Sequence, residues 1–522
     1  MPAGAICIKA GDRAYPFVVV LQGRVEITAT DRTGANVIVA SHGSGEFVGD
    51  VDLLTRQAAV FTATAAEDCR LLMVDATQLR EVSSRNPRIS ETILQAALAR
   101  RELLAGTGAT GVRLIGSRWD QRVAQIKELL ERNSVPYAWL EPEHDPEIDA
   151  MLELLSLSPS DLPVVFCHDG ASMRQPSDTD LAERLGLRRP RLGDGDKIED
   201  LIIVGAGPAG MAAAVYAASE GLRVTLCDAR APGGQAATSS KIENYPGFPT
   251  GVTGADLARR IALQAQKFGT RLCVPCRATS LTRSECGLFQ IEFDDGQSLW
   301  GRCAILATGA RYRRLQLPNE HRFVGTSIFY GATHMEANLC ADQPVAVVGG
   351  GNSAGQAAMF LSEHASHVIL VVRGATLASS MSRYLVNRLE AAPNVEIRFE
   401  SQIRSVSGDE VTGRLCEASI GSSDGPATSE PLGGIFVMIG AESCTEWLNE
   451  TIKLDRNGFI MTGQATADVW PADRIPHELE TSLPGLFAVG DVRSGSMKRV
   501  ATSVGEGASV VRAVHQILQI AI

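Results

Sequence analysis

The feature that most constrains this chain is a unit of strand, glycine-rich turn, helix and second strand that occurs twice. The first copy runs from the apolar strand at Leu201 to Asp228 and contains the turn Gly205-Ala-Gly-Pro-Ala-Gly210. In such a unit Gly205 permits a tight turn, Gly207 lets the backbone approach a pyrophosphate, and Gly210 lets the helix pack on the strand. The helix N-terminus attracts phosphate, and Asp228 can accept hydrogen bonds from a ribose hydroxyl. Because strand, turn, helix and acid are in register, we predict a dinucleotide site rather than an ordinary turn.

The second copy runs from Val345 to Arg373 and contains the turn Gly349-Gly-Gly351-Asn-Ser-Ala354. Its second strand ends at Arg373 rather than at an acid. An acid at this position favours an unphosphorylated ribose, whereas an arginine favours a 2′-phosphate. We therefore predict NADPH as the ligand of this copy. NADH is the alternative if Arg373 is only a solvated charge at a strand end.

The composition agrees with a chain built on such units and excludes several other classes. Among 522 residues there are 50 glycines and only 5% aromatic residues, which suits α/β architecture with many tight turns. The formal net charge of −11, without a basic block, argues against nucleic-acid binding. No apolar run reaches the ~18 residues of a membrane span, and no signal peptide pattern is visible. The 11 cysteines are scattered, which indicates reduced thiols in a cytoplasmic protein. We expect no metal site.

Six motifs follow one another between residues 200 and 522. They are Gly205-Ala-Gly-Pro-Ala-Gly210, Pro232-Gly-Gly-Gln235, Ile242-Glu-Asn-Tyr-Pro-Gly247, Ala307-Thr-Gly309, Gly349-Gly-Gly-Asn352 and Gly490-Asp491. With these motifs, this part of the chain resembles a thioredoxin reductase, within the pyridine nucleotide-disulfide oxidoreductase superfamily. The resemblance implies FAD in the first unit, NADPH in the second, and a homodimer.

The resemblance also assigns cofactor-binding residues by position. The FAD site would contain Gly205, Gly207, Pro208, Ala209, Gly210, Asp228, Gly233, Gly234, Gln235, Asn244, Thr308, Gly309, Gly490, Asp491, Lys498, Arg499 and Val500. The NADPH site would contain Gly349, Gly351, Asn352, Ser353, Ala354 and Arg373. The helix that starts near Val500 would place positive partial charge beside the flavin, which stabilises an anionic reduced form.

We expect a multidomain protein with a β-roll plus helix, a thioredoxin-like α/β unit and two Rossmann-like three-layer α/β domains. The expected bounds are 1–105 for a cyclic-nucleotide-binding-like domain, 111–187 for a thioredoxin- or glutaredoxin-like domain, 188–199 for a linker, 200–317 with 441–522 for the FAD domain, and 318–440 for the NAD(P) domain.

The first hundred residues resemble a cyclic-nucleotide-binding domain through Gly23-Arg-Val-Glu26 and Gly45-Glu-Phe-Val-Gly-Asp50. Such domains hold the ribose with an acid and the cyclic phosphate with an arginine. Asp50 stands where the acid belongs, but Ala58-Ala59 occupies the place of the arginine, and Arg56 is about three residues out of register. We therefore do not expect this unit to bind a cyclic nucleotide, and we interpret it as an inert or protein-binding module.

Residues 111–187 resemble a thioredoxin-like fold through a strand at 112–115, a helix near Trp119 and the segment Leu162-Pro163-Val164. In that fold the proline before the third strand is often cis. The active-site position reads Ser117-Arg-Trp-Asp-Gln121 and contains no cysteine.

The chain departs from thioredoxin reductases where those enzymes carry their redox CxxC. The corresponding stretch, Phe329-Tyr-Gly-Ala-Thr-His-Met335, has no cysteine, and Cys340 stands alone nearby. Disulfide exchange needs one thiolate to attack and a second thiol to resolve. His334 is the one candidate catalytic residue, as a proton carrier, although a packing role is the simpler interpretation. Cys273 and Cys276 are spaced as CxxC, but in an extended strand they would point to opposite faces, so we interpret them as two unrelated core thiols.

These observations predict an FAD-dependent NAD(P)H oxidoreductase that passes electrons to an external acceptor without an internal disulfide. The acceptor, which could be a protein, is not identified by any motif. The alternative is a non-enzymatic flavin and nucleotide redox sensor that signals through its N-terminal modules. Intact glycine turns favour turnover, whereas the altered reactive positions favour the sensor.

Overall fold

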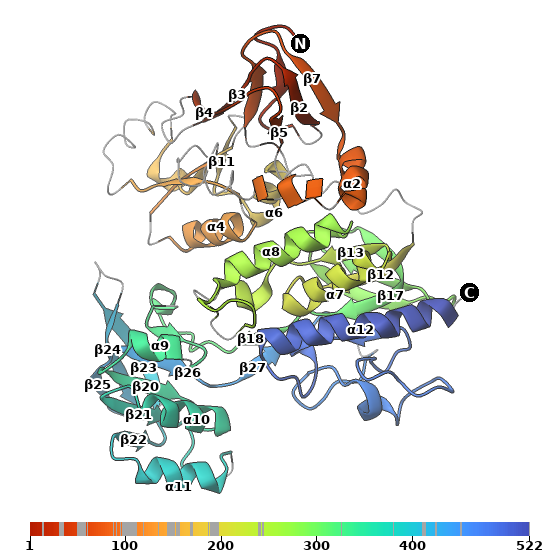
Figure 1. Ribbon diagram of the computed structural model, residues 1–522. Coiled ribbons are helices and arrows are strands. Elements are labelled where there is room, and N and C mark those ends of the chain that lie inside the picture. The colour runs from red at the N-terminus through yellow and green to blue at the C-terminus, as the bar shows by residue number, and fades with distance from the viewer. Residues whose placement is uncertain are drawn as a thin grey trace.

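The computed structural model of the chain describes most of residues 1–522. The residues outside this description are 13–14, 31–35, 50–58, 60, 87, 90, 94, 97–111, 118–119, 134, 143–151, 153–156, 168–170, 186, 188–197, 239–241, 243–244, 325, 333, 379, 410–413, 423–424, 449–451 and 521–522. The described residues form seven sheets, which build a β-rich N-terminal region, a small α/β unit and two larger α/β bodies (Figure 1).

The N-terminal region consists of two small sheets around one apolar core, with the strand orders β1-β6-β3-β4 and β5-β2-β7. The strands are β1 (Ile6–Ile8), β2 (Phe17–Gln22), β3 (Val25–Thr30), β4 (Asn36–His42), β5 (Phe47–Val48), β6 (Thr62–Ala65) and β7 (Arg70–Val74). Helix α2 (Ala76–Arg85) follows β7. It starts there because Asp75 and Gln78 form a reciprocal capping box, in which the Gln78 N–H donates to Asp75 Oδ1 at 2.9 Å.

The small α/β unit has one four-stranded sheet in the order β11-β10-β8-β9. Its elements are β8 (Arg113–Ile115), α4 (Gln121–Arg132), β9 (Ala138–Leu140), β10 (Val164–Phe166), β11 (Ser172–Arg174) and α6 (Asp178–Arg184). Strands β8 and β9 are parallel, as a βαβ unit requires, while β10 is antiparallel to β8. The edge strand β11 is an addition to the predicted pattern. The Leu162–Pro163 peptide bond is cis. The thioredoxin-like assignment of this unit stays a prediction.

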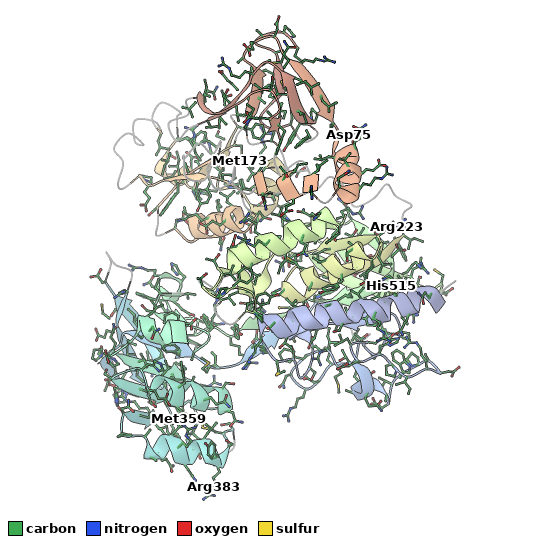
Figure 2. All side chains as sticks on the ribbon, viewed as in Figure 1. Asp75, Met173, Arg223, Met359, Arg383 and His515 are labelled. Atoms are coloured by element: carbon green, nitrogen blue, oxygen red, sulfur yellow. The ribbon has the colours of Figure 1, made fainter. Side chains whose placement is uncertain are left out.

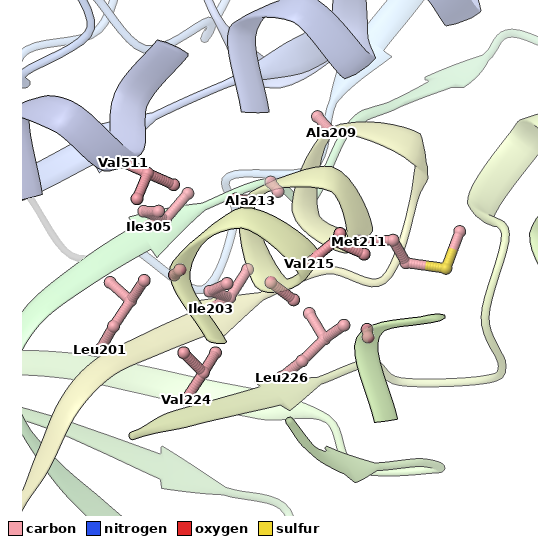
Figure 3. Packing of buried hydrophobic residues seen from close by; sticks show 14 of the residues in the cluster. Leu201, Ile203, Ala209, Met211, Ala213, Val215, Val224, Leu226, Ile305 and Val511 are labelled. Carbon is pink, nitrogen blue, oxygen red and sulfur yellow. The ribbon is translucent and has the colours of Figure 1, made fainter. Parts of the chain in front are cut away.

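The third body is built on a seven-stranded sheet in the order β14-β13-β12-β17-β16-β15, with β28 paired to β17. Its strands are β12 (Glu199–Val204), β13 (Val224–Cys227), β14 (Arg271–Cys273), β15 (Ala278–Arg283), β16 (Phe289–Phe293), β17 (Ser298–Leu306) and β28 (Leu486–Ala488). The helices α7 (Pro208–Ser219), α8 (Gly254–Lys267) and α12 (Val500–Ile520) share a core with one face of this sheet (Figure 3). Strand β12 is apolar from Leu201 to Val204 because Leu201 and Ile203 meet these helices, while Ile202 and Val204 enter a second core on the other face.

The fourth body has a five-stranded parallel sheet in the order β19-β26-β20-β21-β22 and an antiparallel sheet β23-β24-β25. Its elements are β19 (Ile328–Phe329), α9 (His334–Leu339), β20 (Pro344–Val348), α10 (Asn352–Leu361), β21 (His367–Val371), α11 (Arg383–Ala391), β22 (Val395–Arg398), β23 (Gln402–Gly408), β24 (Leu415–Gly421), β25 (Ala427–Pro431) and β26 (Gly434–Val437). The antiparallel pair of β18 (Ala310–Tyr312) and β27 (Ala441–Ser443) lies where the chain passes between the two bodies (Figure 1). Two Rossmann-type bodies and a β-rich N-terminal region are therefore confirmed, and the exact domain bounds stay predictions.

Two further features of the described residues concern membrane-spanning helices and the packing of α12 on α7. Among the residues that the structure describes, no helix is both long and apolar enough to cross a membrane. Helix α12 lies against α7, where a Cβ on Gly507 would stand 2.1 Å from the carbonyl oxygen of Ala209. This close approach ties the last helix of the chain to the first helix of the sheet.

Candidate functional site

The first glycine turn joins β12 to α7 at the carboxyl edge of the seven-stranded sheet. Gly205 has φ +109°, and a Cβ there would stand 2.2 Å from the carbonyl oxygen of Ala307. A Cβ on Gly210 would stand 1.9 Å from the carbonyl oxygen of Gly205. Both glycines are therefore required by the chain itself. Gly207 differs, because it has φ −72° and its Cβ would meet nothing closer than Gly234 Cα at 4.0 Å. The space beside Gly207 is therefore open to a ligand.

Pro208 and Ala209 complete this turn. Pro208 is the first residue of α7, where its missing N–H costs no hydrogen bond. Ala209 is buried, and a Cβ on Gly490 would stand 2.9 Å from its methyl group. The first and last motifs of the chain therefore lie against each other.

Asp228 follows β13 directly, as predicted. Its Oδ2 accepts the N–H of Ala206 at 2.8 Å, and its Oδ1 accepts the N–H groups of Arg230 and Ala231 at 2.9 and 3.1 Å. The carboxylate therefore holds both the glycine turn and the loop that follows β13. A carboxylate oxygen can accept two hydrogen bonds, so a ribose hydroxyl would still find an acceptor here.

Three further segments meet at the same edge. The N–H of Gly233 donates to the carbonyl of Ala206 at 2.7 Å, and a Cβ on Gly234 would stand 3.0 Å from Gly207 Cα. The Gln235 amide donates to the carbonyl of Ala310 at 3.1 Å. The Thr308 hydroxyl donates to the carbonyl of Cys444 at 2.9 Å, and Gly309, with φ +72°, has open space at its Cβ position. Asn244 lies outside the described residues.

The C-terminal motif supplies a buried carboxylate. Asp491 follows β28, and its Oδ1 is buried without a hydrogen-bond partner among the described residues. Burial raises the pKa of Asp491; Lys498 opposes this and Glu506 adds to it. The N–H of Gly490 donates to Glu506 Oε2 at 2.7 Å, and Glu506 is also paired with Arg493. An unpartnered buried acceptor fits a ligand rich in hydroxyl groups, such as the ribityl chain of FAD.

The segment after Asp491 leads to the start of α12. Val500 packs with Ala236 in a small apolar cluster, so the helix start lies beside the 3₁₀ turn Gly234–Thr238. The N–H of Arg499 donates to the carbonyl of Met497 at 2.6 Å, and Lys498 Nζ lies 5.1 Å from the ring centre of Phe459. The open space at Gly207 and the orphaned oxygen of Asp491 therefore fit FAD, while each residue's role stays a prediction.

Replacing Asp491 by Asn should change the stability of the FAD-free protein and its FAD affinity in opposite directions. Folding raises the pKa of the Asp491 carboxyl group above its unfolded-state value of about 4. Ionisation of this group therefore destabilises the folded protein as the pH rises above about 4, and the destabilisation persists at neutral pH. We expect Asp491→Asn to unfold at a higher temperature than wild type at pH 7, with a smaller pH dependence between pH 4 and 7. FAD should bind about tenfold more weakly, because a charged acceptor is lost. Thermal unfolding and calorimetric titration with FAD measure both.

The control for this variant is Asp468→Asn, which alters an exposed aspartate paired with Lys453. It should leave FAD affinity unchanged. Equal FAD affinities in wild type and Asp491→Asn would remove Asp491 from the site.

The second glycine turn joins β20 to α10. A Cβ on Gly349 would stand 2.5 Å from the carbonyl oxygen of Met438, whereas one on Gly351 would meet only Ser380 O, at 3.9 Å. The second turn therefore also contains one glycine that the packing of the chain requires and one glycine that faces open space. Asn352 Oδ1 accepts the N–H of Ser382 at 2.8 Å. In α10, Ser353 is exposed and Ala354 is buried.

The two arginines near this turn are both exposed. Arg373 stands two residues beyond β21. Arg383, which Figure 2 labels, is the first residue of α11. A positive charge at Arg373 is suited to a 2′-phosphate. This leaves NADPH as the expected ligand of the second turn.

The thiols are arranged differently from the prediction. Cys227 and Cys273 are in-register neighbours on β13 and β14, and the N–H of Cys276 donates to the carbonyl of Asp228 at 2.6 Å. The Cys227 thiol interacts with those of Cys273 and Cys276, and these two interactions together with burial raise its pKa well above the usual value. Cys273 and Cys276 are buried free thiols of the core, as predicted, but the expectation that they point to opposite faces was wrong. Both enter the same apolar core, because β14 ends at Cys273 and the chain then turns.

Several predicted residues lie beyond what the structure describes. His334 begins α9, but its side chain is not among the described ones. Asp50, Arg56 and Ala58 fall outside the described residues, while Ala59 is buried. The absence of the phosphate-binding arginine therefore stays a prediction.

Sequence reasoning missed two groups of this site. Glu506 holds Gly490, and its only signal is that it is the single acid within α12. Arg132, at the end of α4, donates to carbonyls of the loop that follows β13, and no motif marks it.

Two glycine turns, each after a strand with parallel neighbours in a separate sheet and each with one glycine that faces open space, are typical of a protein that binds two dinucleotides. Residues 199–507 match the family model of the pyridine nucleotide-disulphide oxidoreductases, and residues 1–86 match that of the cyclic nucleotide-binding domain.

Curated relatives and solved structures agree with this match. The chain is 31% identical over 355 residues to NADPH-dependent thioredoxin reductase 3 of Arabidopsis thaliana, covering 65% of this chain and 64% of that relative. It is 32% identical over 314 residues to a thioredoxin reductase of Eremothecium gossypii, covering 58% of this chain and 93% of that relative. The crystal structure of thioredoxin reductase from Streptococcus pyogenes superposes with a TM-score of 0.53 at 29% identity, covering 62% of this chain and 98% of that one.

The chain belongs to the pyridine nucleotide-disulphide oxidoreductase family, and it carries an N-terminal cyclic nucleotide-binding domain. It is an FAD-dependent NAD(P)H oxidoreductase, and FAD and NADPH are the cofactors of its thioredoxin reductase relatives.

Proposed function

We propose that this enzyme takes electrons from NADPH through FAD to an external acceptor without an internal redox disulfide. The observation that carries the proposal is the state of Cys340, the cysteine nearest to the expected CxxC position. It is 1% exposed, its thiol donates to the carbonyl of Gly433 at 3.6 Å, and burial raises its pKa to about 11. A thiol with such a pKa is almost entirely protonated at neutral pH and is a poor nucleophile for disulfide exchange.

Among the described residues, Cys340 also has no second thiol beside it that could resolve a disulfide. Cys340 packs in an apolar cluster with Phe329 and Ala337, and no other cysteine belongs to that cluster of described residues. Cys444 lies near the FAD site, where its N–H donates to the carbonyl of Gly309 at 3.2 Å, and burial raises its pKa as well. All 11 cysteines of the chain are free thiols. Neither Cys340 nor Cys444 has the paired partner that exchange requires.

When bound, NADPH supplies a hydride and FAD accepts it and releases electrons to an acceptor. The chain's own residues would bind and orient both groups. The glycine turns at Gly207 and Gly351 would receive the two pyrophosphates. Asp228 and Asp491 would accept hydrogen bonds from hydroxyl groups, and Arg373 would face the 2′-phosphate of NADPH. The start of α12 would set positive partial charge beside the flavin.

The finer assignments belong to the same proposal. They are a homodimer, a cytoplasmic location, a thioredoxin-like unit at 111–187 without its own CxxC, and the domain bounds given above. We propose oxygen, a quinone, an iron–sulfur protein or another flavin as acceptor classes. The printed names of the relatives make thioredoxin the acceptor to be tested against these.

The test is anaerobic and steady-state NADPH oxidation by FAD-loaded wild type and by the double variant Cys340→Ser/Cys444→Ser. We expect both proteins to reduce a quinone or ferricyanide at rates within about twofold of each other, because neither thiol takes part. Added thioredoxin should stay oxidised.

Three results would contradict the proposal in different ways. A double variant that loses turnover would show that one of these thiols carries electrons. Fast reduction of thioredoxin by wild type would show disulfide exchange. Flavin reduction by NADPH without turnover on any acceptor would favour the redox sensor.

A further inference from the structure

The end of helix α4 contacts the loop between β13 and the 3₁₀ turn Gly234–Thr238. Arg132 is the last residue of α4, and its Nη2 donates to the carbonyls of Ala231 at 3.4 Å and Gly234 at 3.2 Å. Asn133 caps the same helix, where its side-chain amide donates to the carbonyl of Leu129 at 2.8 Å and approaches that of Arg230 at 3.5 Å. Asn133 is 5% exposed, so this contact is an interior one. Figure 1 shows α4 beside the body that carries α7, α8 and α12.

The contacted loop packs on the first glycine turn. Gly233 and Gly234 have φ +105° and +55°, and Gly233 N–H donates to Ala206 O at 2.7 Å. A Cβ on Gly234 would stand 3.0 Å from Gly207 Cα. Two consecutive glycines with positive φ lose much conformational entropy when they are ordered, so a free loop of this kind has a weak preference for this shape. The two carbonyls that Arg132 binds stand on either side of Gly233.

A charged donor that reaches two backbone carbonyls restrains a loop more strongly than a neutral one. The guanidinium also keeps its several donors in a fixed plane, so it can bridge two acceptors at once. The contact therefore holds the loop in place from outside the seven-stranded sheet.

We infer that Arg132 is a positioning residue for the FAD site, which makes FAD affinity depend on the docking of residues 111–187 onto the loop at 230–234. This inference rests on the proposed FAD site. It gives the small α/β unit a role that needs no cysteine and no ligand of its own, because the unit orders the loop before FAD arrives. Preordering lowers the entropy lost on binding, and so it raises affinity.

The experiment compares full-length wild type with Arg132→Ala, Arg132→Lys and Arg122→Ala. Arg122 lies on the same helix, but its guanidinium donates to Pro176 O at 2.6 and 3.0 Å and pairs with Asp178, all within its own unit. FAD affinity is measured by fluorescence titration of FAD-free protein below its unfolding temperature. Hydrogen exchange of residues 230–238 is measured in the same FAD-free samples.

We expect FAD to bind Arg132→Ala about tenfold more weakly than wild type, with a smaller loss in Arg132→Lys and a change of less than about twofold in Arg122→Ala. Exchange at 230–238 should be faster in Arg132→Ala than in Arg122→Ala. Unchanged FAD affinity and unchanged exchange in Arg132→Ala would overturn the inference. If wild type binds no FAD, the proposed function fails, while the exchange data still decide whether Arg132 holds the loop.

Discussion

Replacing Gly207 by alanine should leave the FAD-free protein folded and greatly weaken its binding of FAD. Gly207 has an ordinary φ of −72°. The nearest atom to a Cβ added there would be Gly234 Cα, at 4.0 Å. The methyl group would instead occupy the space in which we place the pyrophosphate. Overpacking of this kind costs about 1–3 kcal/mol, which corresponds to binding weaker by about fivefold to 150-fold. Thermal unfolding of FAD-free protein and titration with FAD measure the two effects separately.

The matched variant is Gly210→Ala in the same turn. Its Cβ would stand 1.9 Å from a backbone oxygen, so we expect it to destabilise the protein even without FAD. A normal FAD affinity in Gly207→Ala would show that the pyrophosphate lies elsewhere. The same comparison applies to the second turn, with Gly351 as the open position and Gly349 as the structural one.

Replacing Arg474 by alanine should destabilise the FAD-binding body by about 3 kcal/mol, at the lower end of the range for breaking a buried ion pair. Its partner Glu480 is 0% exposed and receives two guanidinium bonds, to Oε2 at 2.7 Å and to Oε1 at 2.5 Å. The N–H groups of His477 and Gly485 also donate to this carboxylate and would reduce the loss of stability. Denaturant unfolding of the FAD-free protein gives the free energy directly.

Two comparisons sharpen this prediction. Arg474→Lys keeps the charge but not the planar fork, so it should recover only part of the stability. Arg260→Ala removes an exposed arginine whose partner Asp256 is also bound by Arg259, and should cost less than about 0.5 kcal/mol. If Arg474→Ala costs no more than Arg260→Ala, the buried carboxylate is not the stabilising feature that its geometry indicates.

The parts of this molecule that local chemistry determines were predictable from the sequence. The turns at Gly205 and Gly349 follow from strand, glycine spacing and helix in succession, and Asp228 stands at the strand end as predicted. Each of these features depends only on residues that are close together in the sequence, so the sequence alone could predict it.

The parts that depend on distant packing could not be predicted. Arg132 reaches a loop about a hundred positions away, and nothing in its own helix marks it as more than a surface cation. The meeting of Cys227 with Cys273 and Cys276 depends on strand register and on the end of β14, which a CxxC spacing does not reveal. Contacts of this kind are set by the whole sheet.

The pairing of β28 with β17 has a consequence for how the protein is made. The sheet that begins with β12 receives its strand β28, and the helix α12 that covers it, only after the entire NAD(P)-side body has left the ribosome. Until then, the apolar residues of β17 and α7 lack their final neighbours, and the glycine turn exists without Asp491. Non-local closure of this kind is slow and leaves apolar surface exposed during synthesis. Newly made chains should therefore acquire FAD only after β28 and α12 have been synthesised.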